Sequence, residues 1–374
     1  MDVFPPGELS LNHWQLATDN FIMLLHGIFP PITTPFYPEG NVYFKKLEGN
    51  VERWCKSPVA GLVVLGSTGE AILLSDQERR DVFKAAREAA TPQKVLIAGT
   101  GIESAIETLR LIEYAASLGY DAAMVRTPHY YKGQMNRPQN MLAFYRTVAD
   151  RSPLPIVIYN FPQATGYDIP AEVAIALAEH PNIIAIKESC GSVEKVQKMV
   201  AFTRHIQRSV TVTEVQEAVT GRMLRGATAQ AAASGELVTM GAPKPSSAAV
   251  DVIGGLKTRQ REVGFQVLVG AAHQLEPSLA VGAVGAILAF ACCAPTACFE
   301  IYAAWKERNE AVAHEKQERI VEAVQKVVAE MSIPGVKYAM DLNGYYGGPV
   351  RLPLLPLTAE DKAKVERLMA NIKN

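Results

Sequence analysis

The sequence has little net charge and few cysteines. Its 37 basic residues nearly balance 38 acidic ones and form no basic stripe interleaved with aromatic residues, so we expect no nucleic-acid partner. The five cysteines are odd in number and lack the spacing of zinc ligands. This pattern favours a reducing compartment over a disulfide framework.

The sequence also lacks a recognisable targeting segment. Residues 1–26 contain no lysine or arginine, which is typical of neither a signal peptide nor a transit peptide, so we expect an N-terminal extension on a cytoplasmic protein. One uncharged stretch, 279–299, is long enough to span a bilayer. It is rich in glycine and alanine and contains Pro295, so we predict a buried strand followed by a packed helix, and no membrane association.

Four apolar residues run without a break into Lys187 within the stretch Asn-Ile-Ile-Ala-Ile-Lys-Glu-Ser at 182–189. The pattern is typical of a strand that is buried on both faces and presents one amine at its end. Such an amine is a candidate nucleophile for a Schiff base with a ketone. The alternative is a surface lysine whose stem lies along apolar neighbours.

Short apolar runs alternate with helical patterns along most of the chain. The predicted strands are 27–36, 61–65, 95–99, 122–125, 155–159, 182–189, 265–269 and 283–288. Strand-helix units without polar alternation indicate a parallel sheet covered by helices, and eight of them predict an α/β fold, a (β/α)8 TIM barrel over 27–295. The competing doubly wound sheet needs a phosphate-binding glycine motif after the first strand, where Pro30 and Pro31 stand.

Two segments lie outside this repeat. Residues 208–264, rich in Ala, Gly, Ser and Thr, separate the sixth helix from the seventh strand, and we expect a flexible or weakly helical insertion there. Residues 296–374 carry helical spacing and many charges. We predict that they form a helical C-terminal extension packed on the barrel rather than a separate domain.

Several polar residues follow predicted strands, where the reacting groups of a TIM barrel lie; they are Ser67, Thr68, Tyr130, Tyr159 and Lys187. Ser67 and Thr68 belong to a glycine-flanked turn whose N–H groups and hydroxyls can hold a carboxylate. Taken singly, each residue has an ordinary alternative. The hydroxyls would bond to local backbone, Tyr159 would be a half-buried strand-end aromatic, and Tyr130 an exposed loop residue.

Four motifs occur in a fixed order: Gly-Ser-Thr-Gly-Glu at 66–70, Tyr-Asn-Phe-Pro at 159–162, Ile-Lys-Glu-Ser at 186–189 and Gly-Gly-Pro at 347–349. With them the chain resembles the dihydrodipicolinate synthase and N-acetylneuraminate lyase family of class I aldolases, over roughly 27–200 and 265–357. The resemblance implies that Lys187 forms the Schiff base and that Tyr159 relays protons with help from the Thr68 hydroxyl. It also implies a homo-oligomer, a dimer or tetramer, in which Tyr130 reaches a neighbouring subunit's site.

The resemblance further implies a substrate-binding set made of Ser67, Thr68, Gly69, position 164 and Gly270. The synthase carries an arginine where this chain has Ala164, and alanine cannot form a bidentate contact with a carboxylate. His129 departs from the usual aromatic residue, and the stretches 130–133 and 343–349 are closer to the 4-hydroxy-2-oxoglutarate aldolase branch. We therefore predict a lyase that cleaves a small 2-oxo acid, 4-hydroxy-2-oxoglutarate, to pyruvate and glyoxylate.

Other functions stay open at this point. The same imine would serve a dihydrodipicolinate synthase or a 2-keto-3-deoxy sugar-acid aldolase or dehydratase. A catalytically silent scaffold is the alternative outside enzymes, since a large insertion could disturb the site. A class II aldolase would need a metal, but the seven histidines show no ligand pair near the motifs, so we expect neither metal nor cofactor.

Overall fold

The computed structural model describes residues 22–234, 251–253 and 255–372. Eight parallel strands form one sheet in the order β1-β11-β10-β6-β5-β4-β3-β2. A bridge between Pro31 and Val63 and a 2.9 Å hydrogen bond from the Ile32 N–H to the Val63 carbonyl join the two edges. The sheet is thus closed, and the predicted TIM barrel is confirmed. The barrel strands are β1 (Gly27–Phe29), β2 (Gly61–Val64), β3 (Val95–Gly99), β4 (Ala122–Arg126), β5 (Ile156–Asn160), β6 (Ile183–Glu188), β10 (Gln266–Val269) and β11 (Gly285–Ile287).

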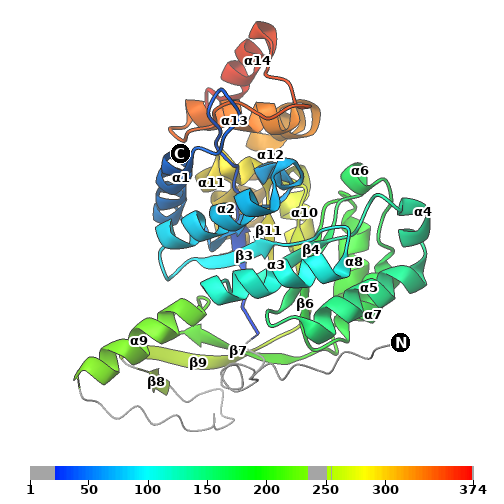
Figure 1. Cartoon of the computed structure of the whole chain (residues 1–374), viewed down its shortest axis with the longest axis vertical. Helices are drawn as coiled ribbons and strands as arrows, with labels where there is room; N and C mark the ends of the chain where they lie inside the picture. The colour runs from blue at the N-terminus through cyan, green and yellow to red at the C-terminus, as the bar shows by residue number, and fades with distance from the viewer. Residues whose placement is uncertain (1–21, 235–250, 254, 373–374) are drawn as a thin grey trace, which may run out of the picture.

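A helix follows each barrel strand and covers the outside of the sheet (Figure 1). These helices are α1 (Phe44–Lys56), α2 (Asp76–Ala89), α3 (Ala105–Leu118), α5 (Pro138–Arg151), α7 (Ala171–Ala178), α8 (Val193–Phe202), α10 (Leu275–Ala280) and α11 (Pro295–Lys306). Two short helices, α4 (Lys132–Met135) and α6 (Pro162–Thr165), lie in the loops after β4 and β5. Helix α2 begins with a capping box, in which the Ser75 and Glu78 side chains each accept the other's backbone N–H.

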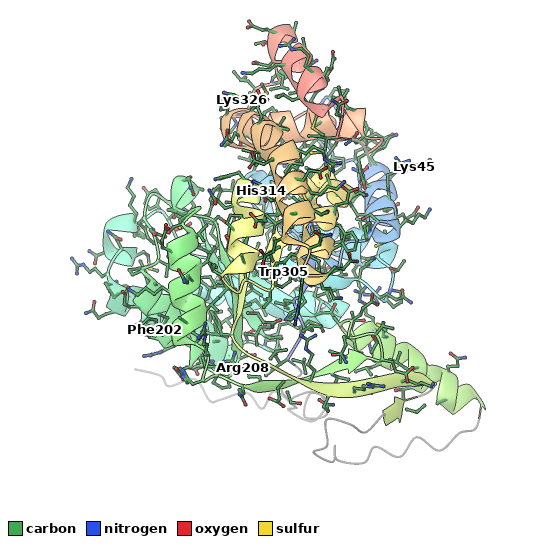
Figure 2. All side chains as sticks on the ribbon, turned by 180° about the vertical axis from the view of Figure 1, so that it is seen from behind. Lys45, Phe202, Arg208, Trp305, His314 and Lys326 are labelled. Atoms are coloured by element: carbon green, nitrogen blue, oxygen red, sulfur yellow. The ribbon has the colours of Figure 1, made fainter. Side chains whose placement is uncertain are left out.

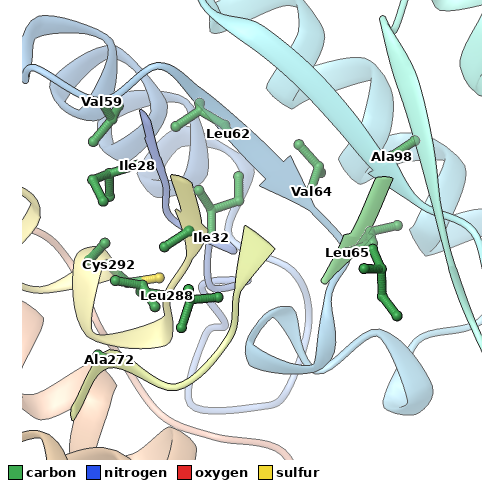
Figure 3. Close-up of a cluster of buried hydrophobic side chains, with 14 of the residues drawn as sticks. Ile28, Ile32, Val59, Leu62, Val64, Leu65, Ala98, Ala272, Leu288 and Cys292 are labelled. Carbon is green, nitrogen blue, oxygen red and sulfur yellow. The ribbon is translucent and has the colours of Figure 1, made fainter. Parts of the chain in front are cut away.

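Apolar side chains fill two layers. One lies inside the barrel, and the other lies between the strands and the helices, where Ile32, Leu62 and Leu288 belong to one buried cluster (Figure 3). Met23 and Leu25 belong to the inner layer, and the Leu25 N–H donates to Gln266 Oε1 at 2.6 Å. Residues 22–26, the part of the N-terminal extension that the structure describes, therefore close the barrel at the amino ends of its strands.

The insertion contains structure that the sequence analysis did not predict. Strands β7 (Arg208–Thr213), β9 (Leu256–Val263) and β8 (Asp251–Ile253) form an antiparallel sheet, accompanied by helix α9 (Gly221–Ser234). Val210, Val212 and Val263 pack against Leu24. Residues 235–250 and 254 of the insertion lie outside the described part.

The insertion lies at the amino ends of the barrel strands, because it joins the end of α8 to the start of β10. Figure 1 shows this sheet and α9 at one end of the molecule, and Figure 2 places Arg208 there, far from Lys326. In a TIM barrel the reacting groups lie at the opposite, carboxyl end of the strands. The insertion is therefore remote from the site predicted here.

The C-terminal extension was expected over 296–374, but residues 296–306 belong to α11, the eighth barrel helix; beyond α11 the extension is helical and packs on the barrel. It comprises α12 (Glu310–Ala323), a π-helical stretch at Val324–Glu330, α13 (Ser332–Leu342) and α14 (Ala359–Met369). The uncharged stretch 279–299 is divided between the end of α10, strand β11 and the start of α11. Among the described residues, no helix has the length and apolar composition needed to cross a membrane.

Arg222 attaches the insertion to the barrel, and its loss tests that attachment. Its buried guanidinium lies 3.5 Å from Asp121 and donates to the carbonyls of Ala90, Thr91 and Lys94. Arg222→Met leaves Asp121 buried without this cation, so we expect a loss of about 3 kcal/mol in the free energy of unfolding. Thermal unfolding measures it. The exposed Arg225 on the same helix supplies the control, Arg225→Met, and equal losses in both variants would contradict the proposed attachment.

Arg351 anchors the C-terminal extension to Glu78 on α2, and this contact predicts a pH dependence. Hydrogen bonds from Arg351 and Ser75 lower the pKa of Glu78 to about 2, although burial alone raises it. Because the pKa of Glu78 is lower in the folded protein, its ionised carboxylate stabilises the fold at pH values above the unfolded-state pKa near 4.5. This stabilisation is lost as the pH falls from there through about 2. We expect Glu78→Gln to lower the thermal unfolding midpoint at pH 7. The difference in midpoint between this variant and the parent protein should become smaller between pH 5 and about pH 3.

The exposed Glu88, also on α2, gives the matched control Glu88→Gln. If the midpoint of Glu78→Gln differs from that of the parent protein by the same amount over this pH range, the Arg351 contact does not stabilise the folded protein.

Candidate active site

Strands β5 and β6 place Tyr159 beside Lys187. The two residues are register partners in the parallel ladder, as are Asn160 and Glu188 behind them. Because side chains alternate along a strand, Tyr159 and Lys187 face the barrel interior, while Asn160 and Glu188 face the helices. Both interior side chains are buried, and Lys187 Nζ lies 4.0 Å from the centroid of the Tyr159 ring. The structure thus brings the predicted amine and phenol together.

The turn after β2 brings a hydroxyl to Tyr159. Residues Ser67–Gly69 form one 3-10 turn, and Ser67 Oγ lies 3.2 Å from the Tyr159 hydroxyl. From the sequence, Thr68 was expected to help the relay, and both Ser67 and Thr68 to bind the carboxylate. Of the side chains that the structure describes here, Ser67 rather than Thr68 makes the contact with Tyr159. The first N–H groups of such a turn have no partner within it, which suits them to bind a carboxylate.

Two of the predicted glycines allow close approach of other groups. A Cβ atom on Gly69 would lie 2.9 Å from the Ile32 carbonyl oxygen, and one on Gly270 would lie 1.9 Å from Ser189 Oγ. Gly270 therefore makes room for the Ser189 side chain. The Ser189 hydroxyl is buried and has no hydrogen-bond partner among the described residues. Ser189 belongs to the lysine motif, yet the sequence analysis did not select it.

A polar network supports the two strand ends from behind. Glu188 is buried and accepts from Asn160 Nδ2 at 2.8 and 3.0 Å and from the Cys190 N–H at 2.7 Å, and it lies 2.9 Å from Lys195 Nζ. Asp168 accepts from Asn160 and from Lys195, each at 2.6 Å. Sequence reasoning missed this network. The position of Glu188, a charge directly after an apolar run and next to the lysine, was the available signal.

The same network bears on metal binding. Asp168, Glu188 and Cys190 offer three potential ligand atoms within 4.8 Å of one another. Burial alone would lower the pKa of Lys195, but Glu188 and Asp168 raise it above its usual value, so the ammonium already supplies a cation to both carboxylates. Burial and Glu188 raise the pKa of the Cys190 thiol to about 11, which disfavours the thiolate that a metal would require. The donor set does not fit a metal.

The remaining predicted residues lie at the surface near the same end of the barrel. Tyr130 is 76% exposed in the loop after β4, and its N–H donates to Glu103 Oε2 at 2.9 Å. His129 Nδ1 lies 2.5 Å from Glu103 Oε1, so this histidine contacts the neighbouring loop, between β3 and α3. Ala164 is exposed on α6. Tyr130 is therefore not covered by its own chain.

Comparisons with known proteins identify the family of this chain. The sequence model of the Dihydrodipicolinate synthetase family matches residues 24–240 and 218–372. The chain is 29% identical over 353 residues to the 4-hydroxy-tetrahydrodipicolinate synthase of Methanothrix thermoacetophila, covering 94% of this chain and 98% of the relative. It is 39% identical over 184 residues to a protein of Emericella nidulans named as a probable mitochondrial 4-hydroxy-2-oxoglutarate aldolase, covering 48% of this chain and 59% of that protein.

A solved structure is similar over nearly the whole fold. It is a prophage protein of the dihydrodipicolinic acid synthase family from E. coli K12, in complex with pyruvate. It superposes with a TM-score of 0.72 at 25% identity and covers 93% of this chain and 99% of its own. The fold and the site define an aldolase-type lyase. The chain belongs to the Dihydrodipicolinate synthetase family.

The contact between Ser67 and Tyr159 predicts different effects for the two neighbouring hydroxyls. We expect Ser67→Ala to lower kcat by about 100-fold, because it removes the group that hydrogen-bonds to the phenol. Thr68→Val keeps that contact, and we expect it to change KM more than kcat. Steady-state kinetics with 4-hydroxy-2-oxoglutarate, the substrate predicted from the sequence, measure both. A larger fall in kcat for Thr68→Val than for Ser67→Ala would return the relay to Thr68.

Proposed function

We propose that this protein is a Schiff-base-forming class I aldolase that cleaves 4-hydroxy-2-oxoglutarate to pyruvate and glyoxylate. The observation that carries the proposal is the buried Lys187 amine beside the Tyr159 ring, with the Tyr159 hydroxyl in contact with Ser67. An amine next to a positioned proton relay is what imine chemistry requires.

The reaction would begin when Lys187 Nζ attacks the C2 ketone of the substrate. Tyr159, paired with Ser67, would carry the proton that the carbinolamine oxygen needs to leave as water, which gives an iminium. The first N–H groups of the Ser67–Gly69 turn would hold the C1 carboxylate. Lys187, Tyr159 and the turn lie on three strand ends of one rigid barrel, so the groups are preorganised for these steps.

Cleavage would follow from the iminium. The C4 hydroxyl gives its proton to the Tyr159 relay, the C3–C4 bond breaks, and its electron pair moves onto the iminium to form an enamine. Glyoxylate leaves with the new carbonyl at the former C4. Protonation of the enamine at C3 and hydrolysis of the imine release pyruvate and regenerate Lys187. We propose that no cofactor takes part, because the iminium itself is the electron sink.

The distal part of the site differs from that of the synthase. Ala164 offers no charged group to a carboxylate, so it does not favour the aldehyde substrate that the synthase's arginine binds. The unpartnered Ser189 hydroxyl instead offers one neutral donor and acceptor on the lysine strand. Glyoxylate also carries a carboxylate, so its recognition here would use neutral groups such as this hydroxyl rather than an arginine.

Two other reactions share the imine. A 4-hydroxy-tetrahydrodipicolinate synthase is favoured by the name of the relative matched over almost its whole length. A 2-keto-3-deoxy sugar-acid aldolase or dehydratase would form the imine with the same residues, Lys187, Tyr159 and Ser67. The position of the insertion at the opposite end of the barrel argues against a catalytically silent scaffold.

We further propose a homo-oligomer. Tyr130 and Tyr131 are 76% and 71% exposed, and their rings pack edge to face at 5.1 Å. Two exposed aromatic residues on one loop are a natural contact for a second copy of the chain, which would deliver Tyr130 to the neighbouring site.

Borohydride reduction followed by peptide mass spectrometry tests the proposal. We expect pyruvate to leave a reduced adduct on Lys187, and 4-hydroxy-2-oxoglutarate to yield both that adduct and free glyoxylate. Lys187→Arg keeps the charge and is the control that should show neither. Consumption of aspartate semialdehyde with pyruvate, but no glyoxylate release, would favour the synthase, and glyceraldehyde-type products from a sugar acid would favour the third reaction.

A further inference from the structure

The turn that carries Ser67 and Thr68 is flanked by two residues in unusual conformations. Leu65 has a φ of 62° and Glu70 a φ of 55°, and neither is glycine. Side chains with a Cβ rarely adopt this left-handed region, and such residues persist where the surrounding structure holds them. The position of the turn therefore depends on contacts from outside it.

Glu70 makes those contacts with the C-terminal extension. Its carboxylate is fully buried; Oε1 lies 2.5 Å from Lys337 Nζ, and Oε2 accepts the Arg351 N–H at 2.9 Å. Lys337 lies on α13, and Arg351 lies in the segment between α13 and α14. Two parts of the extension thus meet one carboxylate directly after the turn.

Lys337 connects this carboxylate to the loop after β1. Its ammonium donates to the Thr34 carbonyl at 2.9 Å and to the Pro349 carbonyl at 2.8 Å. The Thr34 hydroxyl in turn donates to the Gly69 carbonyl at 2.6 Å. One buried ammonium therefore joins α13 and the segment after α13 to the carboxyl end of the turn, directly at Glu70 and through Thr34 at Gly69.

The energetics of the buried Lys337–Glu70 ion pair favour a role in positioning over a role in stability. Burial lowers the pKa of Lys337, against the opposing effect of Glu70, so removing this ammonium from water is costly. Apolar residues of similar volume often stabilise a protein as well as a buried ion pair does, whereas an ion pair with directional partners fixes one arrangement. The pair lies where a single arrangement matters, because Ser67 must stay within reach of Tyr159.

We propose that Lys337 is a positioning residue, and that its ion pair with Glu70 lets the C-terminal extension hold the Ser67–Gly69 turn against Tyr159. This inference rests on the proposed imine chemistry. It assigns to the extension a part in the reaction, although none of its residues would touch the substrate.

Timed borohydride quenching with pyruvate tests the inference, because it gives the rate and the final extent of adduct formation on Lys187. For Lys337→Met we expect the rate to fall by about 10- to 100-fold while the extent per folded molecule stays near that of the parent protein. A purely structural role would instead lower the extent and leave the rate per trapped site unchanged. The matched control is Lys326→Met, which removes a more exposed ion pair with Glu330 in the same extension and should leave the rate unchanged.

A double variant keeps the test decisive if Lys337→Met folds poorly. Lys337→Met with Glu70→Gln removes both buried charges and keeps an acceptor for the Arg351 N–H, so we expect a thermal midpoint near that of the parent protein. We also expect its adduct to form as slowly as that of the single variant. A folded double variant with the parent rate would overturn the inference. Absence of any adduct in the parent protein would overturn the proposed function, and the inference with it.

Discussion

The parallel pairing of β5 with β6 is the constraint on which the site depends. It sets Tyr159 opposite Lys187 inside the barrel and Asn160 opposite Glu188 outside it. A shift of one residue in either strand would turn its reactive side chain toward the helices. Hydrogen bonds between Asn160 and Glu188 oppose that shift, and Lys195 balances the buried negative charge of Glu188. The polar contacts of Glu188 on the outside of the sheet thus fix the geometry of Tyr159 and Lys187 on the inside.

The closed barrel also explains how the fold accommodates a large insertion. A segment between a helix and the next strand emerges at the amino ends of the strands, and there it packs on Leu24 and binds Asp121 through Arg222. The reactive groups occupy the other end. Sheet and helix can therefore be added at the bottom of the barrel without contact with the site.

Local pattern predicted much of the fold. All eight barrel strands, the capping box of α2 and the helical extension follow from periodicity and end signals, because each is encoded by neighbouring residues. The strands of the insertion were missed although Arg208–Thr213 alternates, since the small residues around them suggested a loop. The contacts of Ser67 with Tyr159 and of Glu70 with Lys337 join residues far apart in the sequence. No periodicity encodes such pairs; only the closed fold brings them together.

The site divides into two halves that are built differently. The part that would form the imine lies at strand ends. The pairing of β5 with β6 sets the positions of Tyr159 and Lys187, and the buried Lys337–Glu70 pair supports the turn that carries Ser67. The half that would meet the aldehyde includes α6, with Ala164, and the contact between Ser189 and Gly270. Loop residues can change without altering strand register, so substrate choice can vary while imine chemistry stays constant. Relatives named for different reactions can for this reason share one barrel, and in this chain the Ser189 hydroxyl and the missing arginine bear on the choice between them.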